Sequence, residues 1–110
     1  KQQVLIQIKT HEEHTKSGIS PEESMELAEN ILSLKNLELQ GVMTIGPLTD
    51  DGLITRQAFR ETAAVLARLN LEYGLKLRQI SMGMSGDYVT AVEEGATILR
   101  IGSSIFGSRV

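Results

Sequence analysis

Short apolar runs alternate with amphipathic segments along the chain. The runs at residues 4–8, 37–47, 77–81 and 97–101 are rich in Ile, Leu and Val and are bounded by Gly, Pro or polar residues, which predicts four strands. Between them, apolar residues recur every three or four positions, as one face of a helix requires. The pattern therefore predicts the order βαβαβαβ.

Helix boundary signals support this order. Ser20, followed by Pro21 and by Glu23 three positions after Ser20, forms a capping box at the start of the first helix. The second helix is predicted over residues 53–71 with Gly74 closing it, and a short third helix runs from Asp87 to Glu93. Each crossover is long enough to join neighbouring parallel strands.

Two architectures accommodate this order: an open doubly wound sheet, or a stretch of a (β/α)8 barrel. The first expects a Gly-rich fingerprint after the first strand, where this chain has His and Glu. Barrels often place a phosphate site in the loops after their seventh and eighth strands. We therefore interpret residues 1–110 as a single unit, the C-terminal portion of a parallel TIM barrel comprising strands five to eight.

Both chain ends are abrupt, since a strand begins at Val4 and the chain stops at Val110 soon after the last strand. A complete barrel has about 250 residues. We expect a fragment whose unpaired sheet edges associate with the missing N-terminal half of the barrel or with a second copy.

Two loops rich in Gly and Ser follow the last two predicted strands. Such loops present backbone N–H groups and hydroxyls to a phosphate. Arg100 is a charge inside an apolar strand, so it requires either a ligand or a Glu partner. Met82 and Met84 are expected to be packing residues, of which one could line the face of a planar ring, and Asp87 is expected to cap the third helix. The predicted binding residues are Ser81, Gly83, Met84, Ser85, Arg100, Gly102 and Ser103.

Composition excludes several classes of function. The net charge of −3 and the pI of about 5.4 argue against binding to nucleic acid or to acidic membranes. The chain has no apolar run of about 20 residues for a membrane span. It has no cysteine, which fits the cytoplasm. His11, Glu12 and His14 do not have the spacing of a helical metal-binding motif, so no metal site is predicted.

Residues 81–87 and 94–109 closely resemble the end of the pyridoxal phosphate homeostasis protein family. Residues 5–8, 15–18 and 41–45 are similar to its middle segments. The resemblance implies an alanine-racemase-like barrel that binds pyridoxal 5'-phosphate (PLP). It also implies that Ser85 and the backbone at Gly102 and Ser103 hold the phosphate, and that Arg100 faces the pyridine nitrogen.

The family's lysine that bonds covalently to PLP lies on an early strand, which this chain lacks. Lys9 and Lys16 come from the wrong part of the barrel for that role. The resemblance thus implies an intracellular PLP carrier or regulator without turnover or catalytic residues, with PLP-dependent enzymes as candidate partners. The alternative is a fragment of a PLP-dependent racemase or decarboxylase. A phosphate-sugar barrel enzyme is a third reading, but it requires a carboxylate or lysine at a strand end.

Overall fold

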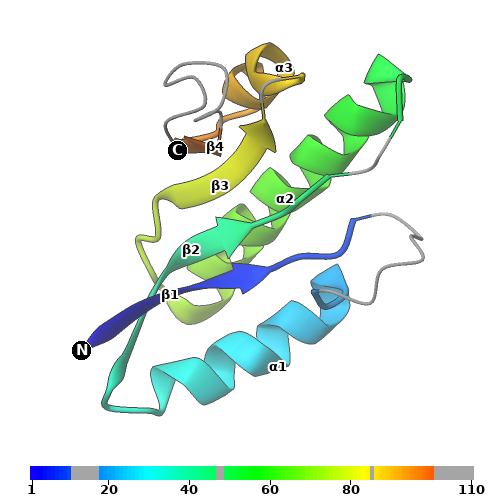
Figure 1. Cartoon of the computed structure of the whole chain (residues 1–110). Helices are drawn as coiled ribbons and strands as arrows, with labels where there is room; N and C mark the ends of the chain where they lie inside the picture. Colours follow the sequence, from blue (N-terminus) through cyan, green and yellow to red (C-terminus); the bar gives the residue numbers. More distant parts are fainter. Residues whose placement is uncertain (11–17, 47–48, 85, 101–110) are drawn as a thin grey trace.

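A computed structural model shows the arrangement of these segments, and it describes residues 1–10, 18–46, 49–84 and 86–100, with the side chain of Arg100 excepted. The elements follow the predicted order (Figure 1). They are β1 (Gln2–Gln7), α1 (Pro21–Leu32), β2 (Leu37–Met43), α2 (Gly52–Tyr73), β3 (Gln79–Met84), α3 (Tyr88–Glu93) and β4 (Ile98–Arg100). The predicted α/β class is confirmed.

The strands of the described residues form one sheet in which they pair in chain order, β1-β2-β3-β4, and every pair is parallel. Gln7 lies opposite Met43, and Met43 lies opposite Ser81. Met84 in turn lies opposite Arg100. The C-terminal ends of all four strands therefore meet at one edge of the sheet.

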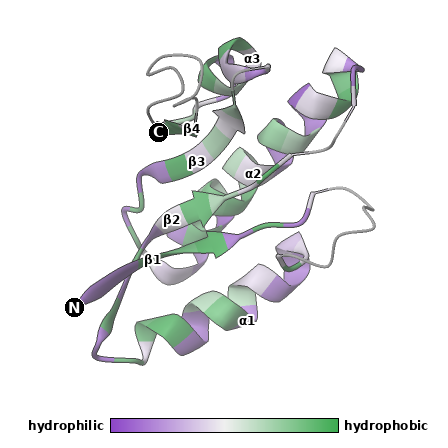
Figure 2. Cartoon of the chain, viewed as in Figure 1, coloured by the Kyte–Doolittle hydropathy of each residue, from purple (hydrophilic) through white to green (hydrophobic). Residues whose placement is uncertain are grey.

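One hydrophobic core lies between the sheet and the helices. It contains Ile6, Val42 and Met82 from the strands. Each helix contributes to the same cluster, including Ala28 from α1, Phe59 from α2 and Ala91 from α3. The helices therefore pack on one face of the sheet. Figure 2 shows hydrophobic residues along the middle of the strands and a hydrophilic N-terminal end of β1.

The opposite face of the sheet carries both polar and apolar side chains. A cavity of about 390 Å³ there is lined by Gln3, Val4, Leu5, Gln40, Gln79 and Ile98, and Ile98 is 40% exposed. No helix of the described residues takes part in lining this cavity. The sheet is thus covered by helices on one face only within the described part of the chain.

The predicted start of α1 and the predicted end of α2 are confirmed. The Ser20 side chain accepts a hydrogen bond from the Glu23 N–H, and a Glu23 carboxylate oxygen accepts one from the Ser20 N–H, which completes the capping box. Gly74 ends α2 with φ 63°, in the left-handed region that glycine adopts at little cost. No helix in the described part of the chain is long and apolar enough to cross a membrane.

β3 begins two residues later than predicted. The N–H of Leu77 donates to the Asn70 side-chain oxygen (2.8 Å), and the Asn70 side-chain amide donates to the Leu77 carbonyl (3.0 Å). Both backbone groups that a strand residue would offer to its neighbours are therefore used by α2. Leu77 remains in the turn, and pairing with β2 starts at Gln79.

Candidate functional site

The candidate site lies at the C-terminal edge of the strands, where Thr44 joins three of them. Its N–H donates to the Ser81 carbonyl of β3 (3.0 Å). Its hydroxyl donates to the Ile8 carbonyl just after β1 (2.9 Å). Thr44 is 2% exposed, so these bonds form in a buried setting. The edge is consequently held together directly beneath the loops that leave it.

The two Gly/Ser loops leave this edge side by side. Met84 is the last residue of β3 and Arg100 is the last residue of β4, and the two are paired across the sheet. The described residues that directly precede the two loops are therefore neighbours. Ser85, Gly102 and Ser103 lie outside the described residues, as does the side chain of Arg100.

The predicted residues within β3 differ in exposure. Ser81 is 5% exposed and lies beneath the edge, opposite Ile98 of β4. Met82 is fully buried in the core, so it is a packing residue. Met84 is 47% exposed at the mouth of the loop. Only Met84 of these three side chains is open to a ligand in the described part of the site.

Gly83 is required by the packing of α3. Its φ is +100°, and a Cβ placed there would lie 2.6 Å from the Ala91 Cβ and 3.0 Å from the Leu99 Cδ2. These atoms belong to α3 and β4, so the space beside Gly83 is filled by protein. Gly86 differs, because nothing lies within 4 Å of the Cβ it could carry. Gly86 is the glycine whose backbone a ligand can approach.

Asp87 occupies the N-cap position of α3, as predicted, but its side chain does not cap the helix. Its Oδ1 instead accepts a hydrogen bond from the Met84 N–H (2.7 Å), while its own N–H donates to the Met84 carbonyl (3.1 Å). The ψ of 18° at Asp87 departs from the extended backbone of a usual N-cap residue. The carboxylate therefore closes the loop back onto β3.

A cross-link between α2 and α3 was not predicted from the sequence. The Arg56 guanidinium donates to Glu93 (2.6 Å) and to Glu94 (2.5 Å), and Arg60 Nε donates to Glu94 (3.1 Å). The hydrogen bond from Arg56, the largest cause, and that from Arg60 lower the pKa of Glu94 against the opposing effect of burial. Four charges spaced this widely in sequence meet only once the helices pack, so no local signal could reveal them.

Two larger cavities lie near the edge. One, of about 650 Å³, lies between the start of α2 and the β3–α3 loop, and we call it the α2–α3 cavity. Its lining includes Thr49, Asp50, Thr55, Met84, Asp87 and Thr90.

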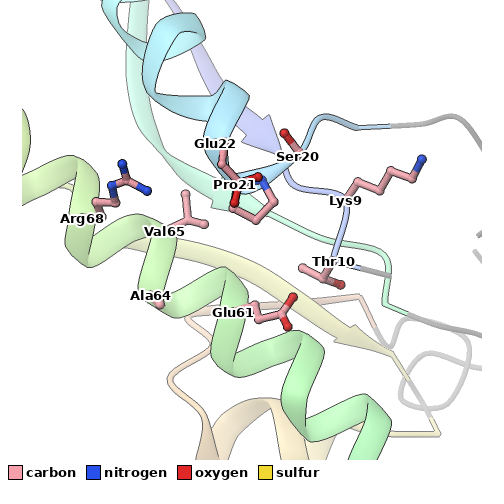
Figure 3. A pocket seen from close by; sticks show the side chains of 9 residues that line it. All are labelled: Lys9, Thr10, Ser20, Pro21, Glu22, Glu61, Ala64, Val65 and Arg68. Carbon is pink, nitrogen blue, oxygen red and sulfur yellow. The ribbon is translucent and has the colours of Figure 1, made fainter. Parts of the chain in front are cut away.

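The other cavity, of about 600 Å³, lies between the end of β1, the start of α1 and the middle of α2. In Figure 3 its basic residues Lys9 and Arg68 lie at opposite ends, with Pro21 and Val65 between them. These two positive charges do not converge on one point, so the cavity is not a compact phosphate-binding site. This agrees with the prediction that Lys9 is not the lysine that bonds to the cofactor.

The metal prediction is tested only in part. No group of three or more His, Asp or Glu side chains suited to a metal ion occurs among the residues that the structure describes. His11, Glu12, His14 and Lys16 lie outside that part of the chain.

The donor groups at the edge fit a phosphate-bearing ligand in two respects. The starts of the two loops are neighbours through the pairing of Met84 with Arg100, and the backbone at Gly86 is open to close approach. The single exposed apolar side chain of the loop, Met84, lies beside them. A planar ring carrying a phosphate would find both polar and apolar contacts here.

The whole chain, residues 1–110, matches the family of the alanine racemase N-terminal domain. A relative from Aquifex aeolicus is 44% identical over 108 residues, and one from Vibrio cholerae is 45% identical over 107 residues; both are named pyridoxal phosphate homeostasis protein. These matches cover 98% and 97% of this chain, but 47% and 45% of the relatives. The chain spans about half the length of the curated relatives it matches.

Two solved structures of PipY from Synechococcus elongatus have the same fold over 96% of this chain and 49% of their own length. The structure without PLP has a TM-score of 0.87 and 31% sequence identity. The structure with PLP bound has a TM-score of 0.84 and 30% identity. A protein from Bifidobacterium adolescentis is also similar, with a TM-score of 0.84, 37% identity and coverage of 94% of this chain and 42% of its own.

We expect Gly83→Ala to destabilise the full-length protein by more than about 1 kcal/mol, because the new Cβ meets Ala91 and the φ is unfavourable for alanine. Gly86→Ala is the matched control and should change the free energy of unfolding by less than about 0.5 kcal/mol. Urea unfolding monitored by circular dichroism measures both. Equal effects of the two substitutions would show that Gly83 is not a packing glycine.

The Glu94 cross-link should weaken in acid. The pKa of Glu94 in the fold lies below its ordinary value of 4.5, so its stabilising contribution is complete above that pH and is lost as the pH falls through the lowered value. Glu94→Gln should therefore be less stable than the parent at pH 7, and the difference should shrink from about pH 5 to about pH 3.

Urea unfolding over this pH series provides the measurement. Glu26→Gln removes one exposed carboxylate from α1 and serves as the charge-matched control. A stability difference for Glu94→Gln that stays constant with pH would contradict the assigned role.

Proposed function

The chain belongs to the alanine racemase N-terminal domain family and, within it, to the pyridoxal phosphate homeostasis proteins, and from this premise we propose that it forms part of a protein that binds PLP and acts in PLP homeostasis without turnover. The observation that carries the proposal is the pairing of Met84 with Arg100, which starts both Gly/Ser loops at one edge of the sheet. The PLP-bound structure of PipY, a structural neighbour, supports the choice of ligand. We assign this role to the cytoplasm, which the absence of cysteine favours.

The fold we propose for the complete protein is a (β/α)8 barrel, of which these strands are the last four. Three observations support it: the strands pair in chain order, the helices lie on one face, and the curated relatives are about twice as long. A doubly wound sheet reverses its strand order at a switch point, and no reversal occurs among the described strands. The face carrying Gln40 and Gln79 would then line the barrel interior.

In this proposal the phosphate is held by Ser85 and by the backbone of Gly102 and Ser103. Ser81 and Gly83 act from beneath the loop, since Ser81 is buried and Gly83 positions α3. Met84 contacts the cofactor ring from the mouth of the loop.

We assign Arg100 to the pyridine nitrogen, where a cation opposes protonation of that nitrogen. PLP supplies an aldehyde and an electron-accepting ring when bound. An unprotonated ring nitrogen weakens electron withdrawal, which favours a carrier over a catalyst. A PLP-dependent racemase or decarboxylase remains the alternative function, and it requires an acid/base group beside the ring.

The described part of the chain has two tyrosines: Tyr88 is the first residue of α3, after the β3–α3 loop, whereas Tyr73 does not lie at the edge. Tyr73 is the last residue of α2, and its hydroxyl donates to the Met25 carbonyl of α1 (2.9 Å). Burial, the largest cause, raises the pKa of Tyr73, so its ionised form is disfavoured. Tyr73 is therefore a structural residue in this proposal.

Reduction with borohydride tests the cofactor proposal. The full-length protein mixed with PLP should be modified on one lysine that lies outside residues 1–110, as mass spectrometry of its peptides would show. Lys9, Lys35 and Lys76 should remain unmodified. Absence of any specific modification would contradict PLP binding, and racemisation of amino acids well above that by free PLP would favour the alternative enzyme.

Arg100→Ala should weaken PLP binding about tenfold, because a charged contact to the ring nitrogen is lost, and it should shift the absorbance spectrum of bound PLP. Spectroscopic titration of the full-length protein provides the measurement. Arg78→Ala is the control, since Arg78 is exposed before β3, at the opposite end of the strands. An unchanged affinity and spectrum for Arg100→Ala would show that Arg100 does not face the ring.

A further inference from the structure

The α2–α3 cavity is a second concave site beside the proposed cofactor loops. Its volume of about 650 Å³ is in the range of small-molecule sites. One wall is the start of α2 with Thr55, and the other is the start of α3 with Thr90. Arg56, the residue after Thr55, pairs with Glu94, four residues after Thr90, so this ion pair fixes the separation of these walls.

The charged side chains known to line the cavity are negative. Asp50 and Asp87 both line it, whereas none of the described residues that line it is a lysine or an arginine. The nearby Arg56 is already paired with Glu93 and Glu94. Asp87 uses Oδ1 for the Met84 N–H, and Asp50 has no hydrogen bond or ion pair with any residue that the structure describes. Within the part of the chain that the structure describes, these two carboxylates therefore have no compensating cation.

Thr55 provides an independent indication of a ligand. It is 5% exposed, and its hydroxyl has no hydrogen-bond partner among the described residues. Thr62 lies two turns further along α2 and is fully buried. Its hydroxyl donates to the Ala58 carbonyl (2.9 Å), which is how a buried threonine in a helix usually satisfies its hydroxyl. Every fully buried side-chain oxygen and nitrogen of the described chain has a partner. The Thr55 hydroxyl must therefore open on the cavity.

We propose that the α2–α3 cavity binds the ammonium group of a small organic amine. An ammonium group has three N–H donors and no acceptor, which matches carboxylate and hydroxyl oxygens from Asp50, Thr55 and Asp87. An anion is disfavoured by the two carboxylates. A divalent metal ion is disfavoured because the described residues contain no group of three or more carboxylate or imidazole side chains.

This site does not rest on the proposed PLP function. Met84 belongs to the lining of the cavity and also to the proposed cofactor residues, so the two sites are neighbours. In this proposal the amine is held by Asp50 in the β2–α2 loop, by Thr55 of α2 and by Asp87 in the β3–α3 loop. Failure of PLP binding would leave the ammonium site standing, and the reverse is equally true.

Calorimetric titration with 1,4-diaminobutane tests the proposal. The full-length protein is used without added PLP, because the aldehyde of PLP itself reacts with amines. We expect saturable binding with a Kd on the order of 1 mM. Asp50→Asn should raise the Kd roughly tenfold, since a charged hydrogen bond is lost. Thr55→Val, which keeps the shape of the side chain, should raise it about fivefold, and Thr55→Ser should restore binding.

The controls separate a specific site from general attraction. Glu26→Gln removes one surface carboxylate from α1 and should leave the Kd unchanged. The uncharged analogue 1,4-butanediol should not bind. The proposal is overturned if the diol binds as tightly as the diamine, if Mg²⁺ binds in place of the diamine, or if neither Asp50→Asn nor Thr55→Val changes the Kd.

Discussion

Parallel pairing of the strands in chain order is the constraint on which the rest of the structure depends. Each crossover between neighbouring parallel strands is right-handed, so a sheet built in the order β1-β2-β3-β4 receives all its helices on the same face. The C-terminal ends of the strands then meet at one edge, and the loops that leave them are neighbours. The same constraint places the core on one face of the sheet, where Ile6, Val42 and Met82 face the helices. Gln40 and Gln79 lie on the other face, which the described helices do not cover.

The β3–α3 junction shows how this edge is given a fixed shape. A helix of six residues has little stability of its own, so α3 depends on its contacts. Gly83 lets Ala91 pack against the end of β3, and Arg56 with Glu94 joins α3 to α2. Asp87 closes the loop onto Met84. Stability at this junction and the geometry of the loop are therefore set by the same few contacts.

Local signals in the sequence were sufficient for most of the fold. The capping box at Ser20 and the terminal Gly74 act within one turn, so their residue types reveal them, and both are present as predicted. The apolar pattern places Leu77 in a strand. It cannot reveal the hydrogen bonds between Leu77 and Asn70, because these depend on how α2 ends. The Asp87 side chain was expected to cap α3, but its backbone conformation directs it to Met84. The ion pairs of Arg56 and the free hydroxyl of Thr55 arise only from packing, which residue spacing does not encode.

Charge separates the two proposed ligands at this edge. Asp50 and Asp87 make the α2–α3 cavity unfavourable for phosphate, although Met84 borders both sites. None of the described side chains of β4 lines that cavity, and the backbone of β4 ends with Arg100 opposite Met84. The phosphate is therefore best accommodated on the β4 side of Met84 and the ammonium group on the α2 side. An anion and a cation on either side of one loop attract each other, so occupation of one site should favour occupation of the other.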